Sequence, residues 1–180
     1  KEMMKWRYLP SLHFINTYHD NPDFIDAIAA SIQKDFDLNG KPQKLVMSYH
    51  GMPERNLHLG DPYYCFCMKT TRLVVEKLGL SEDDYVATFQ SRVGKAKWLQ
   101  PDTDATIGSL PAKGITDIAV ICPAFSADCL ETLEEIAMEG EEIFHEMGGQ
   151  EFTTIPCLND DDAWVTLLAK WIKNWALASK

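Results

Sequence analysis

Residues 44–79 read KLVMSYHGMPERNLHLGDPYYCFCMKTTRLVVEKLG, an apolar run, a loop with Gly and Pro, and an amphipathic segment. The run at 44–49 predicts a buried strand, because it is short, apolar and bounded by turn residues. The pattern at 63–79, which stops at Gly79, predicts a helix. A strand followed by a helix is the unit from which parallel sheets are built.

The same unit recurs along the chain. Further strands are predicted at 12–16, 85–90, 117–122 and 152–156, and further helices at 23–36, 103–112, 127–147 and 161–176. We therefore predict one α/β domain over residues 1–180, with a parallel sheet of five βα units and helices on both faces. In such a sheet, ligands bind outside the carboxyl ends of the strands.

Composition excludes several classes of protein. The 180 residues carry a formal charge of −10, which argues against a nucleic-acid partner because phosphate binding needs a basic surface. Neither a membrane-spanning apolar stretch nor a signal sequence is apparent, so we expect a cytoplasmic protein. The first residues, KEMMKWRYLP, look like the middle of a chain and indicate a piece of something longer.

Three segments follow predicted strands and should share one edge of the sheet: His50, FQSRVGKAKWLQP at 89–101 and CPAFSADCLETLEEI at 122–136. His50 can exchange a proton near neutral pH. Its alternative role is that of a histidine hydrogen-bonded into its loop. The sequence alone leaves both roles open.

Acidic residues recur every four positions at Glu131, Glu135 and Glu139, which stacks three carboxylates on one face of a helix. We call these three residues the glutamate ladder. It suits the movement of protons or divalent cations, although a solvated helix face would look the same. Glu131 is favoured for function because it lies near the helix start.

The same segments supply aromatic and basic side chains. Trp98 and Phe125 would face a flat apolar ligand or belong to the core. Arg92 would bind a carboxylate of a ligand or pair with a structural one. Cys65 and Cys67 are only one residue apart, a weak pattern for a metal site.

Three motifs resemble the ferrochelatases, which insert ferrous iron into a porphyrin to make haem. LVMSYHGMP at 45–53 with GDPY at 60–63 is similar to the family signature, and TFQSRVGKAKWLQPDTD at 88–104 and CPAFSADCLETLEEI at 122–136 are similar to further family segments. The resemblance extends from about residue 10 to residue 176. It points to the enzymes of Gram-negative bacteria.

This resemblance implies a Rossmann-like, chelatase-like domain that is the C-terminal half of a two-half enzyme. The porphyrin would lie between the halves, and the N-terminal half would be a partner that supplies the other wall and a lip for peripheral membrane association. The fragment alone is expected to be inactive. Protoporphyrin IX and coproporphyrin both stay open as substrates.

The resemblance also implies roles for individual residues. His50 would be the active-site histidine and accept pyrrole protons, and Glu131 would be the active-site glutamate on the other side of the ring. Glu135 and Glu139 would continue a path for protons or metal, while Trp98 and Phe125 would line the pocket.

The implied ligands are Fe²⁺, as substrate, and no tightly bound cofactor. An iron–sulfur cluster is not expected, because no cysteine-rich extension follows Trp175. Cys129 stands where many relatives have a histidine, which puts a metal-handling role there in doubt. There are two rival hypotheses. One is a non-catalytic module that binds a tetrapyrrole or a metal, and the other is a chelatase for a different tetrapyrrole or metal, such as cobalt with a corrin precursor.

Overall fold

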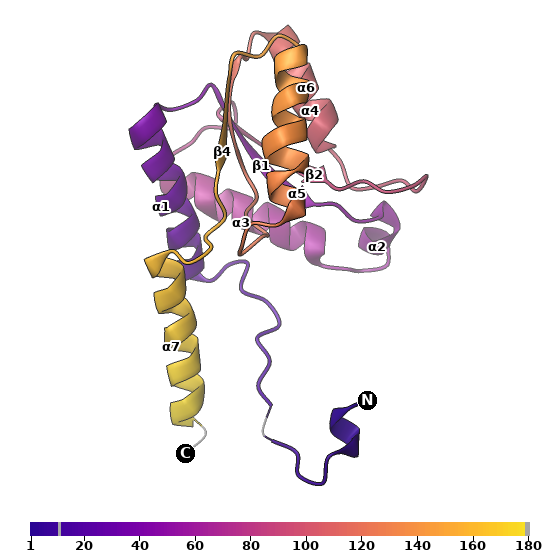
Figure 1. The fold of residues 1–180 in the computed structure, drawn as a ribbon, viewed down its shortest axis with the longest axis vertical. Helices are drawn as coiled ribbons and strands as arrows, with labels where there is room; N and C mark the ends of the chain where they lie inside the picture. The colour runs from indigo at the N-terminus through magenta and orange to yellow at the C-terminus, as the bar shows by residue number, and fades with distance from the viewer. Residues whose placement is uncertain (11, 179–180) are drawn as a thin grey trace.

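The computed structural model, which describes residues 1–10 and 12–178, contains a parallel sheet (Figure 1). Its four strands are β1 (Lys44–His50), β2 (Tyr85–Gln90), β3 (Asp117–Ile121) and β4 (Glu151–Ile155), in the order β2-β1-β3-β4. Met47 of β1 pairs with Ala87 on one side and Ile121 on the other. All carboxyl ends therefore meet at one edge of the sheet, as predicted.

Helices cover both faces of this sheet. The elements are η1 (Met3–Lys5), α1 (Pro22–Asn39), α2 (Glu54–His58), α3 (Tyr63–Leu78), α4 (Thr103–Ser109), η2 (Pro111–Lys113), α5 (Leu130–Leu133), η3 (Glu135–Gly140), α6 (Glu141–Glu146) and α7 (Asp162–Ala178). Helices α1, α3 and α7 contribute to the core on one face, and α4, η3 and α6 to the core on the other. The predicted α/β architecture is confirmed.

Strand β1 separates the two cores. Leu45, Met47 and Tyr49 pack into the core with α1 and α3, whereas Val46 packs into the opposite one. Successive strand residues point to opposite faces, so a strand buried on both sides is an apolar run. This is why residues 44–49 carried so strong a signal.

Two helix boundaries are set by their caps, and the one at Gly79 confirms the prediction. The side chain of Asn21 accepts hydrogen bonds from the backbone N–H groups of Asp23 and Phe24, and Pro22 begins α1. Gly79 ends α3 in the left-handed conformation. Local sequence was sufficient at both positions.

The strand predicted at 12–16 was wrong. Residues 12–18 have no strand structure, and the chain before α1 runs away from the sheet (Figure 1). Leu12, Phe14 and Ile15 are 55%, 75% and 47% exposed. Their apolar pattern favours extended backbone, but a strand also needs a neighbouring strand to bond with, and the described sheet offers this segment none. The sheet therefore has four βα units, not five.

The single helix predicted at 127–147 was also wrong in detail. The structure has α5, the π-helical segment η3 and α6 in its place. The helix predicted at 103–112 is α4 followed by the short η2 turn. Both regions are helical, but their hydrogen-bond registers change at positions that hydrophobic spacing does not reveal.

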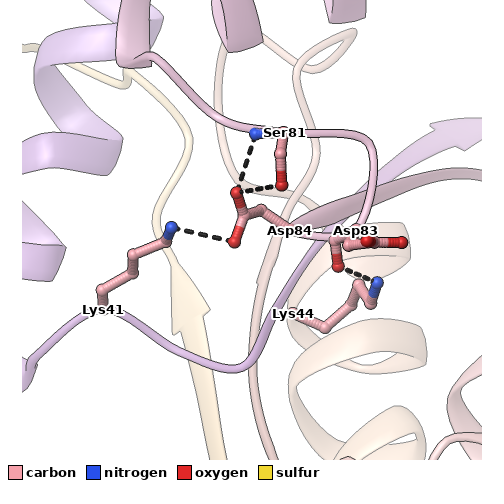
Figure 2. A network of polar contacts seen from close by, with 5 residues as sticks. All are labelled: Lys41, Lys44, Ser81, Asp83 and Asp84. Carbon is pink, nitrogen blue, oxygen red and sulfur yellow. Dashed lines mark hydrogen bonds and ion pairs between the residues drawn. The ribbon is translucent and has the colours of Figure 1, made fainter.

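At the amino edge of the sheet, polar groups are closely paired (Figure 2). The Asp84 carboxylate accepts hydrogen bonds from the Ser81 backbone N–H and hydroxyl, both at 2.7 Å, and from Lys41 Nζ at 2.9 Å. Lys44 Nζ donates to the Asp83 carbonyl.

Across residues 1–10 and 12–178, no helix is both long and apolar enough to cross a membrane.

Candidate active site

A cleft of about 650 Å³ opens at the carboxyl edge of the sheet. Six of the seven residues singled out from the sequence line it: His50, Arg92, Trp98, Glu131, Glu135 and Glu139. The seventh, Phe125, is half-buried beside the cleft, with its ring centroid 6.3 Å from that of His50. The three segments predicted to share one edge therefore do so.

His50 is the last residue of β1 and is exposed to the cleft. Its Nδ1 lies 2.7 Å from the Gly51 carbonyl oxygen, which can only accept a hydrogen bond. The ring proton of the neutral imidazole is therefore on Nδ1, and Nε2 presents a lone pair. The Tyr63 hydroxyl donates to the His50 carbonyl at 2.9 Å and helps fix the residue in place.

Gly51 allows the strand end to pass close to the next strand. A Cβ atom there would lie 2.5 Å from the Gln90 carbonyl oxygen and 3.1 Å from Cε3 of Trp98. Because real side chains do not approach backbone so closely, only glycine fits between the histidine and the aromatic wall. The Trp98 ring is also held by its Nε1, which donates to the Val93 carbonyl at 3.1 Å.

Glu131 lies in the first turn of α5, after the N-cap residue Cys129. A hydrogen bond from the Cys129 thiol lowers the pKa of the Glu131 carboxyl, with bonding from the helix backbone and the nearby His50 acting in the same direction. Cys129, which stands where many relatives have a histidine, thus contacts Glu131 directly. Its hydrogen bond favours the ionised form of the Glu131 carboxyl.

Glu135 and Glu139 belong to the π-helical segment η3. The Glu139 N–H donates to the Glu134 carbonyl at 2.9 Å, the i to i+5 bond of a π-helix. This wider turn still directs both carboxylates into the cleft, so the glutamate ladder survives the change of register. Short π-helical segments are frequent at functional sites.

Residues 1–176 match the family model described as Ferrochelatase. The chain belongs to the ferrochelatase family. It is 69% identical over 173 residues to Ferrochelatase 2 of Shewanella oneidensis and 63% identical over 178 residues to the ferrochelatase of Shewanella denitrificans. Both matches cover 96% of this chain and 53% of the relative, so the chain spans about half the length of these ferrochelatases.

One solved structure is a weaker match. It is a putative cobalamin biosynthesis CbiX protein from Marinobacter aquaeolei, with a TM-score of 0.48 and 13% identity over 77% of this chain and 100% of that chain. Nothing follows for this ferrochelatase-family chain from a likeness at that level.

Sequence reasoning missed several residues of the ferrochelatase-family cleft, namely Gln90, Ser91, Asp102, Thr103 and Asp104. The strand-end rule placed the segment 89–101 at this edge, but it assigned no role to Gln90, the last residue of β2, or to Ser91, which follows it. Asp104 had no comparable signal. Burial raises its pKa, and the nearby Asp102, Glu135 and Glu139 add to the effect.

The charge of the cleft is strongly negative. Six carboxylates line it (Asp102, Asp104, Glu131, Glu134, Glu135 and Glu139), against one guanidinium, that of Arg92. Such a concentration of one sign attracts cations. Within residues 1–10 and 12–178, no three His, Cys, Asp or Glu side chains are grouped so that they could hold a metal ion.

The cysteines do not form a paired site. Cys65 is exposed and Cys67 is buried, so the two neighbouring thiols face different surroundings, and neither lines the cleft. Burial raises the pKa of the Cys67 thiol to about 12, which keeps it protonated at neutral pH.

Proposed function

We propose that this chain is the catalytic wall of a ferrochelatase that inserts Fe²⁺ into protoporphyrin IX. The observation that carries the proposal is the opening of one histidine lone pair and three stacked glutamates into the same cleft. A chelatase needs both, because two pyrrole N–H protons must leave the ring while a hydrated divalent ion enters it.

His50 would accept the pyrrole protons. With its Nδ1 proton bonded to the Gly51 carbonyl, the free Nε2 is the only basic atom of the ring, and a histidine is well matched to proton transfer near neutral pH. The exposed position at the end of β1 allows a flat substrate to approach it. Each accepted proton would then pass to solvent or to the acidic side of the cleft.

The glutamate ladder would carry ferrous iron inward or protons outward. Carboxylate oxygens bind first-row divalent ions less tightly than thiolates or imidazoles, which suits a cargo that must be released. The lowered pKa of Glu131 keeps its carboxyl ionised, the form needed for either task. No cofactor is required by this scheme, since iron is a substrate.

The apolar side chains at the cleft would contact the macrocycle. Trp98 and Phe125 offer ring surface, and the 73% exposed Val93 offers further apolar surface at the mouth. Arg92 is exposed and supplies the one guanidinium among the described residues that line the cleft, so it would bind a propionate of the porphyrin. We further propose that the rest of the polypeptide, present in the longer relatives, supplies the opposite wall.

The test is zinc insertion into protoporphyrin, followed by fluorescence. The assay uses this chain alone and fused behind the non-aligned part of Ferrochelatase 2 from Shewanella oneidensis, which we call the joined protein. We expect insertion by the joined protein and little by the chain alone. Absence of insertion by both would contradict the proposal.

The same assay separates the rivals. A non-catalytic module would bind protoporphyrin in the joined protein without metallating it. A chelatase of another specificity would metallate a corrin precursor with cobalt in preference to protoporphyrin with zinc or iron.

A further inference from the structure

The geometry points to Gln90 and Ser91 as positioning residues that fix the Glu135 carboxylate at the middle of the glutamate ladder. The inference rests on the proposed function for what the ladder does. We call the hydrogen bonds from Gln90 and Ser91 to the Glu135 carboxylate the clamp. The clamp itself is inferred from contacts within this chain.

Glu135 receives three donors from two consecutive residues at the end of β2. The Ser91 backbone N–H donates to Oε1, the Ser91 hydroxyl donates to Oε2 at 2.6 Å, and Gln90 Nε2 donates to Oε2 at 3.3 Å. Both oxygens are therefore held. Among the described residues, no hydrogen bond or ion pair holds the Glu139 carboxylate in this way.

Ser91 adopts an unusual backbone conformation to make these contacts. Its φ of 63° lies in the left-handed region that residues other than glycine rarely occupy. In this conformation the N–H and the hydroxyl of one residue both reach the same carboxylate. Strain of this kind persists where the surrounding structure holds it, and it concentrates at functional sites.

Gln90 is oriented from beneath the cleft. Its side-chain Oε1 accepts from the Ser48 hydroxyl at 2.8 Å, and the Ser48 and Thr103 hydroxyls lie 2.9 Å apart. All three side chains are buried, with exposed fractions of 2%, 0% and 0%. The amide NH₂ group must therefore face the helix, where Nε2 also donates to the Glu131 carbonyl at 2.6 Å.

The clamp consequently joins three parts of the site. It ties β2 to the first turn of α5 through Glu131 and to the start of η3 through Glu135. Ser91 also begins the loop that carries Arg92 and Trp98. Holding Glu135 still would keep the middle carboxylate within reach of its two neighbours, so loss of the clamp should slow transfer more than it weakens porphyrin binding.

The first test is a double-mutant cycle in the joined protein, with zinc insertion as the readout. Ser91→Ala should lower kcat about tenfold, the effect of one hydrogen bond to a charged group, and leave the KM for protoporphyrin within about twofold. In a Glu135→Ala background, Ser91→Ala should change kcat by less than about twofold, because its partner is already gone. Equal losses in both backgrounds would overturn the inference.

Two controls sharpen the cycle. Ser91→Gly removes the hydroxyl and also relieves the left-handed backbone strain. If the hydroxyl matters, its kcat should be as low as that of Ser91→Ala. A wild-type kcat would mean that the loss in Ser91→Ala comes from strain, and would overturn the clamp. Ser81→Ala removes an equivalent hydroxyl bond, to Asp84 at the far edge of the sheet, and should leave kcat unchanged.

A second readout separates this inference from the proposed function. If the parent joined protein inserts no metal, the proposed function fails, and the clamp is judged by urea unfolding of this chain. We expect the stability losses of Ser91→Ala and Glu135→Ala to be strongly non-additive. Simple additivity would overturn the clamp whatever the activity.

Discussion

At each edge of the sheet, one serine donates two hydrogen bonds to one carboxylate, but the third donor differs. At the amino edge, Ser81 donates through its N–H and hydroxyl to Asp84, and Lys41 completes the carboxylate's bonding (Figure 2). At the carboxyl edge, Ser91 also donates through its N–H and hydroxyl, one to each oxygen of Glu135, but the third donor is the neutral Gln90. One edge neutralises its charge, and the other keeps a negative charge facing the cleft.

The pKa directions follow this difference. Lys41, with help from Ser81, lowers the pKa of Asp84. At the other edge, burial and neighbouring carboxylates raise the pKa of Asp104. A cluster of carboxylates costs stability, and its position at the carboxyl edge supports the proposal that it serves binding or catalysis.

The largest effect should come from His50→Ala. In the joined protein we expect zinc insertion to fall about 100-fold or more, because a general base typically contributes that much. Folding should be unaffected, since the side chain is exposed at the rim. His58→Ala, at another exposed histidine outside the cleft, is the matched control. A loss shared by both variants would contradict a specific role for His50.

A smaller effect, on both stability and the site, should come from Gly51→Ala. The added methyl group would lie 2.5 Å from the Gln90 carbonyl oxygen, so strand ends must move apart. We expect a loss of about 1–3 kcal/mol in the free energy of unfolding, as for other overpacked positions. Urea unfolding measures this loss. Gly108→Ala is the comparison and should cost less, because the atom nearest to its added methyl group belongs to the side chain of Ile143, which can move more easily than backbone. Equal effects would mean that the two strand ends tolerate separation.

The smallest effects should have opposite signs at the two edges. The lowered pKa of Asp84 means that its ionised form stabilises the fold above about pH 4, and that this contribution disappears as pH falls through the lowered value. The raised pKa of Asp104 means that its protonated form is favoured in the fold, so its contribution is lost as pH rises through the raised value.

Replacement by asparagine should therefore separate the two. At neutral pH, Asp84→Asn should lower the free energy of unfolding and Asp104→Asn should raise it. Toward about pH 4 the Asp104→Asn difference should shrink, whereas the Asp84→Asn difference should persist, because it is lost only below that pH. Urea unfolding at the two pH values measures them. Changes of the same sign at neutral pH would remove the distinction between the edges.

Much of this arrangement was predictable because it follows from period and order along the chain. The buried run at 44–49 and the strand-end rule placed His50 at this edge of the sheet, and four-residue spacing placed the three carboxylates of the glutamate ladder on one face of a helix that follows another strand. The prediction failed for residues 12–16, where apolar alternation indicated a strand but no partner strand exists among the described residues. Pairing is a property of tertiary structure that spacing does not record.

The clamp on Glu135 was not predictable for a related reason. Nothing local marks Ser91 as left-handed, and its partner is 44 residues away. Just before η3, the Glu131 carbonyl likewise accepts a hydrogen bond from Gln90, 41 residues away, which four-residue spacing does not record. Sequence reasoning found the groups that could do chemistry and missed the groups that hold them.

The central claim is that His50 and the glutamate ladder act on one porphyrin from opposite sides. The most direct measurement is a crystal structure of the joined protein with protoporphyrin bound. The account predicts a macrocycle in the cleft with His50 Nε2 facing one side of the ring and the Glu131 carboxylate facing the other. A ring with both side chains on the same face, or bound away from this cleft, would contradict it.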